Sequence, residues 1–169
     1  MGTSRWLIER ISKTHERDSF DCGNGRLNDF LESFAQEHDR KEISRTYVAV
    51  RPGDPAIKGY YTVRNRHVEI RDLPEEVKRG LPRYPVPVVH LARLAVSEDA
   101  QGSGLGACLL VSALQLALAV SEKIGVYAVE VVAKDDRART FYEKYGFKGL
   151  PQDRLYLYLP LQVLKRLSP

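Results

Sequence analysis

Three glycines lie between two regular patterns, in the stretch Gln101-Gly102-Ser103-Gly104-Leu105-Gly106. Residues 88–96 before this loop have the composition of a strand, and the apolar run after it predicts a helix. Glycine lets the backbone curl and approach a ligand without a Cβ clash. The N–H groups that begin a helix favour negative charge. The spacing therefore predicts a loop that holds a phosphate-like anion.

The glycine spacing excludes two familiar phosphate loops. A P-loop requires Lys followed by Ser or Thr directly after its last glycine, whereas this chain continues with Ala107 and Cys108. The dinucleotide fingerprint G-x-G-x-x-G does not match either, because the glycines fall at positions 102, 104 and 106. Taken alone, the loop is equally consistent with an ordinary turn that caps a helix.

A second block gives the loop a context. Residues 135–147 read D-D-R-A-R-T-F-Y-E-K-Y-G-F and follow a strand pattern. The loop matches Gln/Arg-x-x-Gly-x-Gly/Ala, and the two blocks together resemble the GCN5-related N-acetyltransferase (GNAT) family, whose second segment is N-x-x-A-x-x-F-Y-x-x-x-G-F. Asp135 stands where the family more often has Asn. Two blocks in the right order, with a strand pattern between them, make an ordinary turn a poor explanation.

The resemblance implies acetyl-CoA as the acetyl donor, and the spacing of the Cys and His residues indicates no metal site. On that basis, the 101–106 loop would bind the pyrophosphate, and Leu94, Ala95 and Val96 would pair with the pantetheine arm like an added strand. A backbone N–H there could also polarise the thioester carbonyl. Core packing is the alternative for these three residues. Both can hold, because successive side chains of a strand alternate between its faces.

Tyr142 is the candidate general acid, because resembling GNAT enzymes use the tyrosine of the F-Y pair to protonate the departing CoA thiolate. A phenol with a pKa near ~10 is protonated at neutral pH and can donate this proton. The alternative is a tyrosine that only packs, which we favour for Tyr145. No general base stands out, since His67 and His90 are lone histidines in strand-like surroundings. An α-amine with a pKa of ~7.7–8.0 has a useful neutral fraction without one.

The chain carries a second, narrower resemblance. Residues 20–31 (F-D-C-G-N-G-R-L-N-D-F-L), 44–50 (S-R-T-Y-V-A-V) and 91–96 (L-A-R-L-A-V) are similar to blocks of the GNAT toxins of bacterial type II toxin–antitoxin systems. This resemblance implies acetylation of the α-amine of aminoacyl-tRNA, which blocks translation, and a small DNA-binding antitoxin as partner. Ser44, Arg45 and Arg93 lie in these blocks and could face the tRNA acceptor end. Surface solvation or structural pairing is the alternative.

Two other functions stay open. A GNAT enzyme could acetylate a small amine or a protein N-terminus, and a degenerate relative could bind CoA or a partner without catalysis. The intact loop and Tyr142 argue against the degenerate relative. The charge balance agrees with tRNA, because the net charge is +4 and 17 arginines outnumber 9 lysines. The guanidinium fork suits phosphate.

Length and composition predict one domain, residues 1–169. With two cysteines there is no disulfide framework, and Cys108 is expected in the core because it lies in an apolar helix pattern. Residues 1–6 contain no long apolar stretch, so we expect no signal peptide. The longest apolar run, residues 104–120, is shorter than the roughly 20 residues of a membrane span. A cytoplasmic protein without a membrane partner is the simplest expectation, and a homodimer is compatible with it.

The patterns predict an α/β fold. Strands are expected at residues 6–11, 45–50, 57–66, 88–96, 126–132, 147–148 and 155–159. Helices are expected at 24–37, 103–123 and 136–145, with a short one that begins at 73–77. The GNAT resemblance implies a central mixed, mostly antiparallel sheet of six to seven strands flanked by about four helices.

Overall fold

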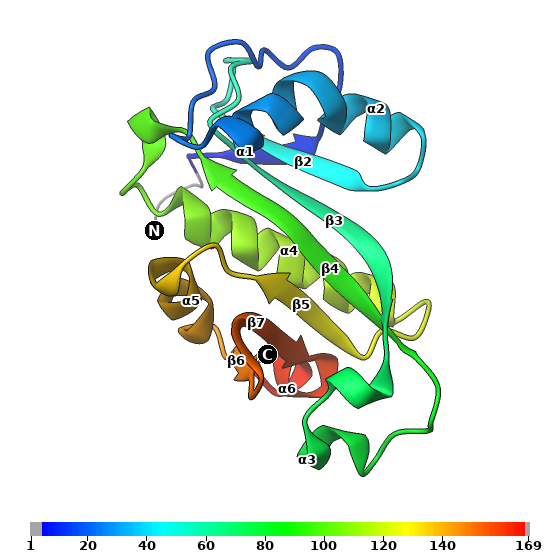
Figure 1. The fold of residues 1–169 in the computed structure, drawn as a ribbon. Coiled ribbons are helices and arrows are strands. Elements are labelled where there is room, and N and C mark those ends of the chain that lie inside the picture. Colours follow the sequence, from blue (N-terminus) through cyan, green and yellow to red (C-terminus); the bar gives the residue numbers. More distant parts are fainter. Residues whose placement is uncertain (1–4, 168–169) are drawn as a thin grey trace. The chain divides into compact units, whose positions relative to one another are not determined.

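The computed structural model describes residues 5–167 (Figure 1). Residues 1–4, on which the expectation about a signal peptide partly rests, lie outside the described part. The fold is α/β, as predicted, with one seven-stranded sheet in the order β1-β2-β3-β4-β5-β7-β6. The strands are β1 (Leu7–Arg10), β2 (Arg45–Val50), β3 (Gly59–Val68), β4 (Val86–Val96), β5 (Ala128–Val132), β6 (Lys148–Leu150) and β7 (Asp153–Pro160).

The sheet is mixed, which confirms the predicted class. Antiparallel pairs join β1 to β2, β2 to β3, β5 to β7 and β6 to β7. β4 and β5 are parallel, because a helix connects them. The helices are α1 (Gly25–Asp29), α2 (Ala35–Arg40), α3 (Glu75–Lys78), α4 (Leu105–Ser121), α5 (Asp136–Glu143) and α6 (Leu161–Leu167). In the described chain, no helix has the length and apolar character to cross a membrane.

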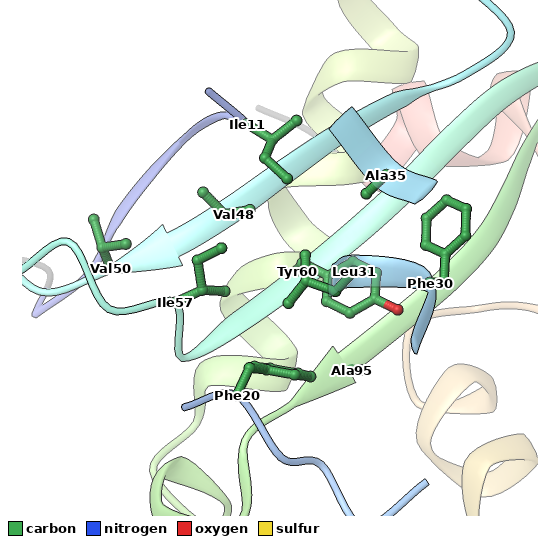
Figure 2. Close-up of a cluster of buried hydrophobic side chains, with 10 residues drawn as sticks. All are labelled: Ile11, Phe20, Phe30, Leu31, Ala35, Val48, Val50, Ile57, Tyr60 and Ala95. Carbon is green, nitrogen blue, oxygen red and sulfur yellow. The ribbon is translucent and has the colours of Figure 1, made fainter. Parts of the chain in front are cut away.

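The described residues form two compact units. The first comprises residues 5–64 and Ala92–Ala113. Its core is a cluster of buried side chains from the first helices and from β2, β3 and β4 (Figure 2). Tyr60 is fully buried there, with its ring centroid 5.6 Å from that of Phe20 and 6.4 Å from that of Phe30. Its hydroxyl donates a hydrogen bond to the Leu27 carbonyl at 2.7 Å, so the β3 tyrosine fastens α1 to the sheet.

The helix predicted over residues 24–37 is divided into three pieces. Asn24 caps α1, since its side-chain oxygen accepts hydrogen bonds from the Arg26 and Leu27 N–H groups. A π-helical turn, Phe30–Phe34, then separates α1 from α2. Phe30 and Leu31 of this turn are buried, whereas Phe34 is half exposed. A continuous helical pattern contains no signal for such a turn.

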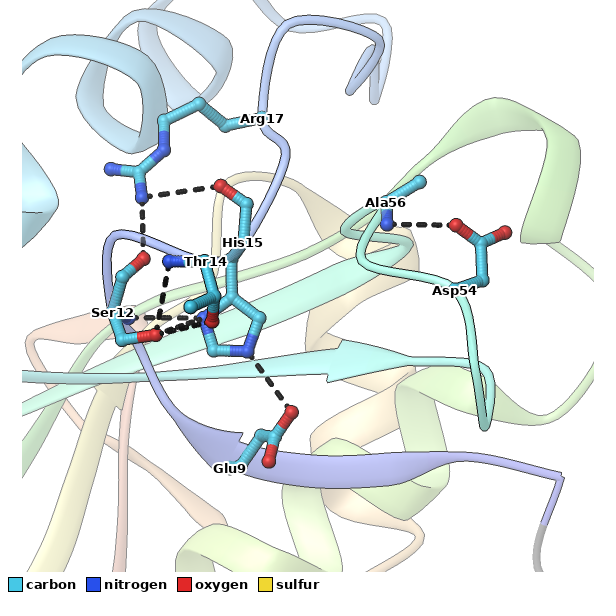
Figure 3. A network of polar contacts seen from close by, with 7 residues as sticks. All are labelled: Glu9, Ser12, Thr14, His15, Arg17, Asp54 and Ala56. Carbon is cyan, nitrogen blue, oxygen red and sulfur yellow. Dashed lines mark hydrogen bonds and ion pairs between the residues drawn. The ribbon is translucent and has the colours of Figure 1, made fainter.

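A buried histidine orders the segment before α1 (Figure 3). His15 Nδ1 accepts a hydrogen bond from the Ser12 N–H at 3.0 Å, so the ring proton lies on Nε2, which faces Glu9 Oε1 at 3.0 Å. Arg17 Nη2 donates to the Ser12 carbonyl at 2.9 Å. These contacts give the chain between β1 and α1 a defined path without secondary structure of its own.

The second unit comprises Asn65–Leu91 and the chain from Leu114 onward. Its core cluster joins Val68, Val86, Val88 and Ala128 from three strands with Leu73 from the segment before α3. The short α6, which the sequence analysis did not predict, begins where β7 ends and buries two leucines. Thus α3 and α6 each pack on an apolar surface of the strands in this unit.

The expectation that Cys108 is a core residue was wrong. Cys108 is exposed, on the same face of α4 as Val111 and Gln115. The buried face carries Leu109 and Ala113 instead. α4 is apolar on nearly all sides, so its sequence has little amphipathic period from which the buried face could be assigned.

Candidate functional site

The loop between β4 and α4 has the backbone that an anion site requires. Gly102 and Gly104 have φ angles of +79° and +85°, which side chains with a Cβ rarely adopt. A Cβ added at either position would meet no atom within 4 Å, so the space above the loop is open. α4 begins at Leu105, and the N–H groups of its first turn have no acceptor within the helix. This part of the chain therefore fits a pyrophosphate.

Two polar side chains of the loop fasten it from within. Gln101 Nε2 donates to the Val96 carbonyl at 3.0 Å and to the Cys22 carbonyl at 3.4 Å. Ser103 Oγ donates to the Ala100 carbonyl at 2.5 Å. These side chains hold the backbone in position, which leaves the backbone N–H groups as the donors for an anion.

The segment before α1 supports the same loop. The Asp21 carbonyl accepts hydrogen bonds from the Glu98 N–H at 2.7 Å and from Ser97 Oγ at 3.4 Å. Lys58, which directly precedes β3, also donates a hydrogen bond from Nζ to Asp99 Oδ2 at 2.7 Å. The loop is thus fixed to two other parts of its unit before any ligand arrives.

Gly59 on β3 determines how closely α4 approaches the sheet. A Cβ at this position would lie 2.9 Å from Leu109 Cδ1, 3.0 Å from Leu105 Cδ2 and 3.3 Å from the Ala95 carbonyl oxygen. Real Cβ atoms rarely come so close to other atoms, so any larger residue would require the two leucine side chains to shift. The contact sets the position of the first turn of α4, and with it the loop.

The strand residues predicted for the pantetheine arm lie at the end of β4. The registered pairing of β4 with β5 ends at Leu91, opposite Val131, whereas β4 continues to Val96. Ala95 is buried in the core of the first unit, and Leu94 and Val96 are partly buried. Core packing and a backbone available for an added strand are therefore compatible here.

Arg93 is a partly buried cation next to another cation. Its guanidinium carbon lies 3.6 Å from the centroid of the Phe30 ring. Burial lowers the pKa of Arg93; Tyr60 opposes this effect, and the nearby Arg64 charge adds to it. Among the described residues, no carboxylate forms an ion pair with Arg93. This positive charge is therefore available to an anionic ligand.

Ser44 and Arg45 lie in a structural network. Arg45 Nη1 donates to the Asp39 carbonyl at 2.5 Å. The buried Asp39 carboxylate accepts from Arg10 Nε at 2.8 Å and from the Thr46 N–H at 3.3 Å. The Ser44 hydroxyl is buried and has no hydrogen-bond partner in the part of the chain that the structure describes. The contacts of Arg45 with Asp39 favour the structural alternative for Arg45, and burial favours it for Ser44.

Tyr142 belongs to the second unit. Asp135 caps α5, since its carboxylate accepts a hydrogen bond from the Ala138 N–H at 2.8 Å, so Asp supplies the cap where relatives more often have Asn. Tyr142 is buried on α5, with its ring against those of Phe141 and Phe147. Burial raises the pKa of Tyr142 to about 12. The phenol therefore stays protonated at neutral pH, as a proton donor must.

The second unit also contains a buried charge cluster that the sequence analysis missed. Glu130 on β5 lies opposite His90 on β4, with Glu130 Oε2 2.7 Å from His90 Nδ1 and 3.0 Å from Arg66 Nε. Neither of these two contacts has the angle of a good hydrogen bond. Tyr156 OH donates to Glu130 Oε1 at 2.5 Å and accepts from Arg66 Nη2 at 3.1 Å.

The cluster keeps its carboxylate ionised. Burial would raise the pKa of Glu130, but the contacts with His90 and Tyr156 and the charge of Arg66 outweigh it, so the pKa is lowered. Burial and the contact with Glu130 raise the pKa of Tyr156 to about 12. His90 is thus not the lone histidine that its position in the sequence indicated. In residues 5–167, no group of three His, Cys, Asp or Glu side chains could hold a metal ion.

Comparison with known proteins covers both units. Residues 42–149 match a family model described as an acetyltransferase (GNAT) domain. The tRNA-acetylating toxin of Mycobacterium tuberculosis (strain ATCC 25618 / H37Rv) is 37% identical over 150 residues, which are 89% of this chain and 89% of that protein. The structure of AtaT complexed with acetyl-methionyl-tRNAfMet has a TM-score of 0.89 and 29% identity, over 96% of this chain and 98% of that one. A tyrosine-to-phenylalanine mutant of the toxin AtaT, bound to the C-terminus of the antitoxin AtaR and to acetyl-CoA, has a TM-score of 0.82 and 28% identity, with the same coverage.

Proposed function

Because the chain belongs to the GCN5-related N-acetyltransferase (GNAT) family, we propose that it transfers an acetyl group from acetyl-CoA to the α-amine of an amino acid on tRNA. The observation that carries this proposal is the 37% identity with a tRNA-acetylating toxin over most of both chains. The complex of AtaT with acetyl-methionyl-tRNAfMet supports the same acceptor. An acetylated α-amine cannot accept a peptide, so the product would block translation.

On the donor side, the first unit supplies the binding groups. The backbone of residues 101–106 and the first turn of α4 would hold the pyrophosphate, with positive φ at Gly102 and Gly104 shaping the loop. Leu94, Ala95 and Val96 would pair with the pantetheine arm, because β4 continues past its last β5 partner. A backbone N–H of this stretch would polarise the thioester carbonyl. Acetyl-CoA itself supplies the acetyl group as an activated thioester.

Tyr142 is the catalytic residue that we propose for the departing thiolate. When the amine nitrogen bonds to the carbonyl carbon and the C–S bond breaks, the sulfur needs a proton. The raised pKa keeps that proton on the phenol until it is required. Because α5 begins at an Asp135 cap and the Tyr142 ring packs against Phe147, the hydroxyl has a fixed position on its helix.

Arg93 would contact the acceptor end of the tRNA. Its charge has no carboxylate partner among the described residues, and the neighbouring Arg64 adds a second cation. A phosphate between two guanidinium groups would relieve their repulsion. We propose that Arg45 supports this side of the first unit through Asp39 rather than by direct contact with the acceptor, and that the buried Ser44 packs beside it.

Partners and location follow from this function. We propose that the chain is a single GNAT domain and the toxin of a toxin–antitoxin pair. Its inhibitor would be a small DNA-binding antitoxin, as AtaT binds AtaR. A protein whose substrate is charged tRNA would act in the cytoplasm.

One experiment tests the proposed reaction. The protein is incubated with labelled acetyl-CoA and total charged tRNA, and the RNA is then treated with mild base to release the esterified amino acid. We expect label in an N-acetyl amino acid released from tRNA. Free amines and a protein with an accessible N-terminus serve as competing acceptors. Label on these and none on tRNA would contradict the proposed acceptor but keep the acetyltransferase.

A further inference from the structure

An exposed phenylalanine of the first unit has no role in the functions assigned so far. Phe34 ends the π-helical turn before α2 and is 49% exposed. Residues four positions apart share a face of an α-helix, so an α-helical turn would place Phe34 beside the buried Phe30. Here the Ala35 N–H donates to the Phe30 carbonyl, five residues back, and Phe34 lies at the surface. Such turns are frequent at functional sites.

Phe34 is one of three rings in contact, whereas an isolated exposed ring would need no explanation. The centroid of the Phe34 ring lies 6.1 Å from that of His38, which in turn lies 5.6 Å from that of Phe30. Phe30 belongs to the buried core cluster (Figure 2). The His38 carbonyl accepts a hydrogen bond from the Ile43 N–H at 3.0 Å. The exposed ring therefore rests on a support that is fixed to the core.

Two cations adjoin these rings. The guanidinium carbon of Arg93 lies 3.6 Å from the centroid of the Phe30 ring. Arg64 is exposed and lies close enough for its charge to act on Arg93. In the described chain, neither arginine forms an ion pair with a carboxylate. Proteins bind single-stranded nucleic acid with this combination, in which aromatic rings stack on bases and cations contact the backbone.

We propose that Phe34 stacks on an unpaired base at the 3′ end of the tRNA, while Arg93 and Arg64 contact a phosphate of the same strand. This inference rests on the proposed aminoacyl-tRNA acceptor and concerns the first unit alone. The amino acid is esterified to the last nucleotide of an unpaired 3′ end, so the nearby bases are free to stack. A base held on Phe34 would fix the position of this end and would distinguish it from duplex RNA.

The test is a double-mutant cycle between Phe34 and a base. Uncharged tRNA is prepared intact and with one abasic nucleotide at each unpaired position of the 3′ end in turn, and affinities are measured by filter binding. At one position, removal of the base should weaken wild-type binding about 5- to 100-fold, the range that stacking on a ring contributes. Phe34→Leu keeps apolar bulk without the ring. It should lose a similar factor on intact tRNA and no further affinity at that abasic position.

Two further variants separate the ring from its apolar surface. Phe34→Tyr keeps a ring and should bind both tRNAs as the wild type does. Leu7→Ala removes another apolar side chain of the same unit, 47% exposed on β1, and should change neither affinity. Thermal melting checks that each variant is folded, as expected for changes at half-exposed positions.

Three results would overturn the stacking. The first is wild-type affinity of folded Phe34→Leu for intact tRNA. The second is that the losses from the missing ring and the missing base add at every position. The third is a loss seen only with charged tRNA and dependent on the attached amino acid, because Phe34 would then contact the amino-acid side chain.

The binding cycle is independent of the reaction, because uncharged tRNA has no amine to acetylate. Transfer of label from acetyl-CoA to charged tRNA is measured separately with wild-type enzyme. Transfer without coupling between Phe34 and a base would keep the proposed function and reject the stacking. Coupling without transfer would do the reverse. Wild-type protein that binds no tRNA would contradict both.

Discussion

At the residue scale, Tyr142 carries the most direct prediction. Tyr142→Phe keeps the ring that packs against Phe147, so the variant should melt at nearly the same temperature as wild type. Its kcat should fall about 10²–10⁴-fold, because the thiolate loses its proton donor. Steady-state kinetics on charged tRNA, with thermal melting as the folding control, checks this. A change confined to KM would show that the phenol only positions substrate.

The pH dependence of Tyr142 follows from its raised pKa. A general acid is active while protonated, so a phenol with a pKa of about 12 is fully active at pH 8 and remains so to pH 10. Its activity would be lost only as the pH rises through about 12. We therefore expect a kcat profile without a decline due to Tyr142 between pH 8 and 10. A decline with a midpoint near ~10 that is absent from Tyr142→Phe would contradict this.

Arg93 and Arg45 should respond differently to the same substitution. Arg93→Gln removes an unpaired cation and should lower the slope of log affinity for tRNA against log salt by about 1. Arg45→Gln removes the donor to the Asp39 carbonyl and should lower the free energy of unfolding by roughly 1–3 kcal/mol. Filter binding at several salt concentrations and urea unfolding measure the two effects. A reduced salt slope for tRNA binding by Arg45→Gln would show instead that Arg45 contacts the tRNA.

At the scale of elements, the loop between β4 and α4 can be tested with a matched pair of glycines. Gly104→Glu places bulk and negative charge where a pyrophosphate would lie, and should abolish measurable acetyl-CoA binding by calorimetry. Gly53 has a φ angle of +80° and equally open surroundings in the turn between β2 and β3. Gly53→Glu therefore has the same backbone strain and charge, and should bind acetyl-CoA normally. Equal acetyl-CoA binding by both variants would show that the pyrophosphate does not bind at this loop.

Elements were predictable where the pattern is local. The predicted strand 45–50 coincides with β2, and α4 lies within the predicted helix 103–123. A run of β-branched and aromatic residues favours a strand, whereas an apolar run as long as residues 104–120 favours a helix. The seven residues of α6 are too few to display a helical period, and the π-helical turn Phe30–Phe34 has the same apolar spacing as an α-helix.

The candidate site likewise contains parts that the sequence predicts and parts that it does not. The glycine loop and the Tyr142 segment are motifs of neighbouring residues, so the sequence was enough to find them. His90 meets Glu130 only because β4 and β5 pair in one particular register. A shift by one residue would turn these side chains to opposite faces. The sequence of either strand alone does not reveal this register. Nothing in it therefore indicates that His90 has Glu130 as a partner.

At the scale of the whole molecule, the excess of positive charge predicts a salt-dependent enzyme. The net charge of +4 is modest, but arginine dominates it. Acetylation of charged tRNA should fall steeply as salt rises, since phosphate contacts release counterions, whereas acetylation of a free amino-acid ester should change little. Parallel assays from 50 to 300 mM salt, roughly spanning the range in which such contacts weaken, measure this. Equal salt dependence for both acceptors would contradict a phosphate contact.

Growth offers a second test of the whole molecule. Expression without an antitoxin should stop bacterial growth, and Tyr142→Phe should abolish the arrest, because arrest requires transfer of the acetyl group rather than binding alone. Wild-type protein that is harmless at high expression would rule out the toxin, while the acetyltransferase would stand. The inactive variant, expressed to the same level, is the control for protein load.

The hydrogen bonds that Glu98 and Gln101 donate to the Asp21 and Cys22 carbonyls have a further consequence. Asn24 caps α1, and α1 leads into the turn whose Phe30 ring packs against the Arg93 guanidinium. The loop and the support of Arg93 are therefore connected by one short stretch of chain, residues 21–30. If acetyl-CoA binding at the loop changes the affinity of this unit for tRNA, thermodynamic reciprocity requires that tRNA change the affinity for acetyl-CoA by the same factor. The two substrates would then influence each other without touching, through the chain that connects their binding residues.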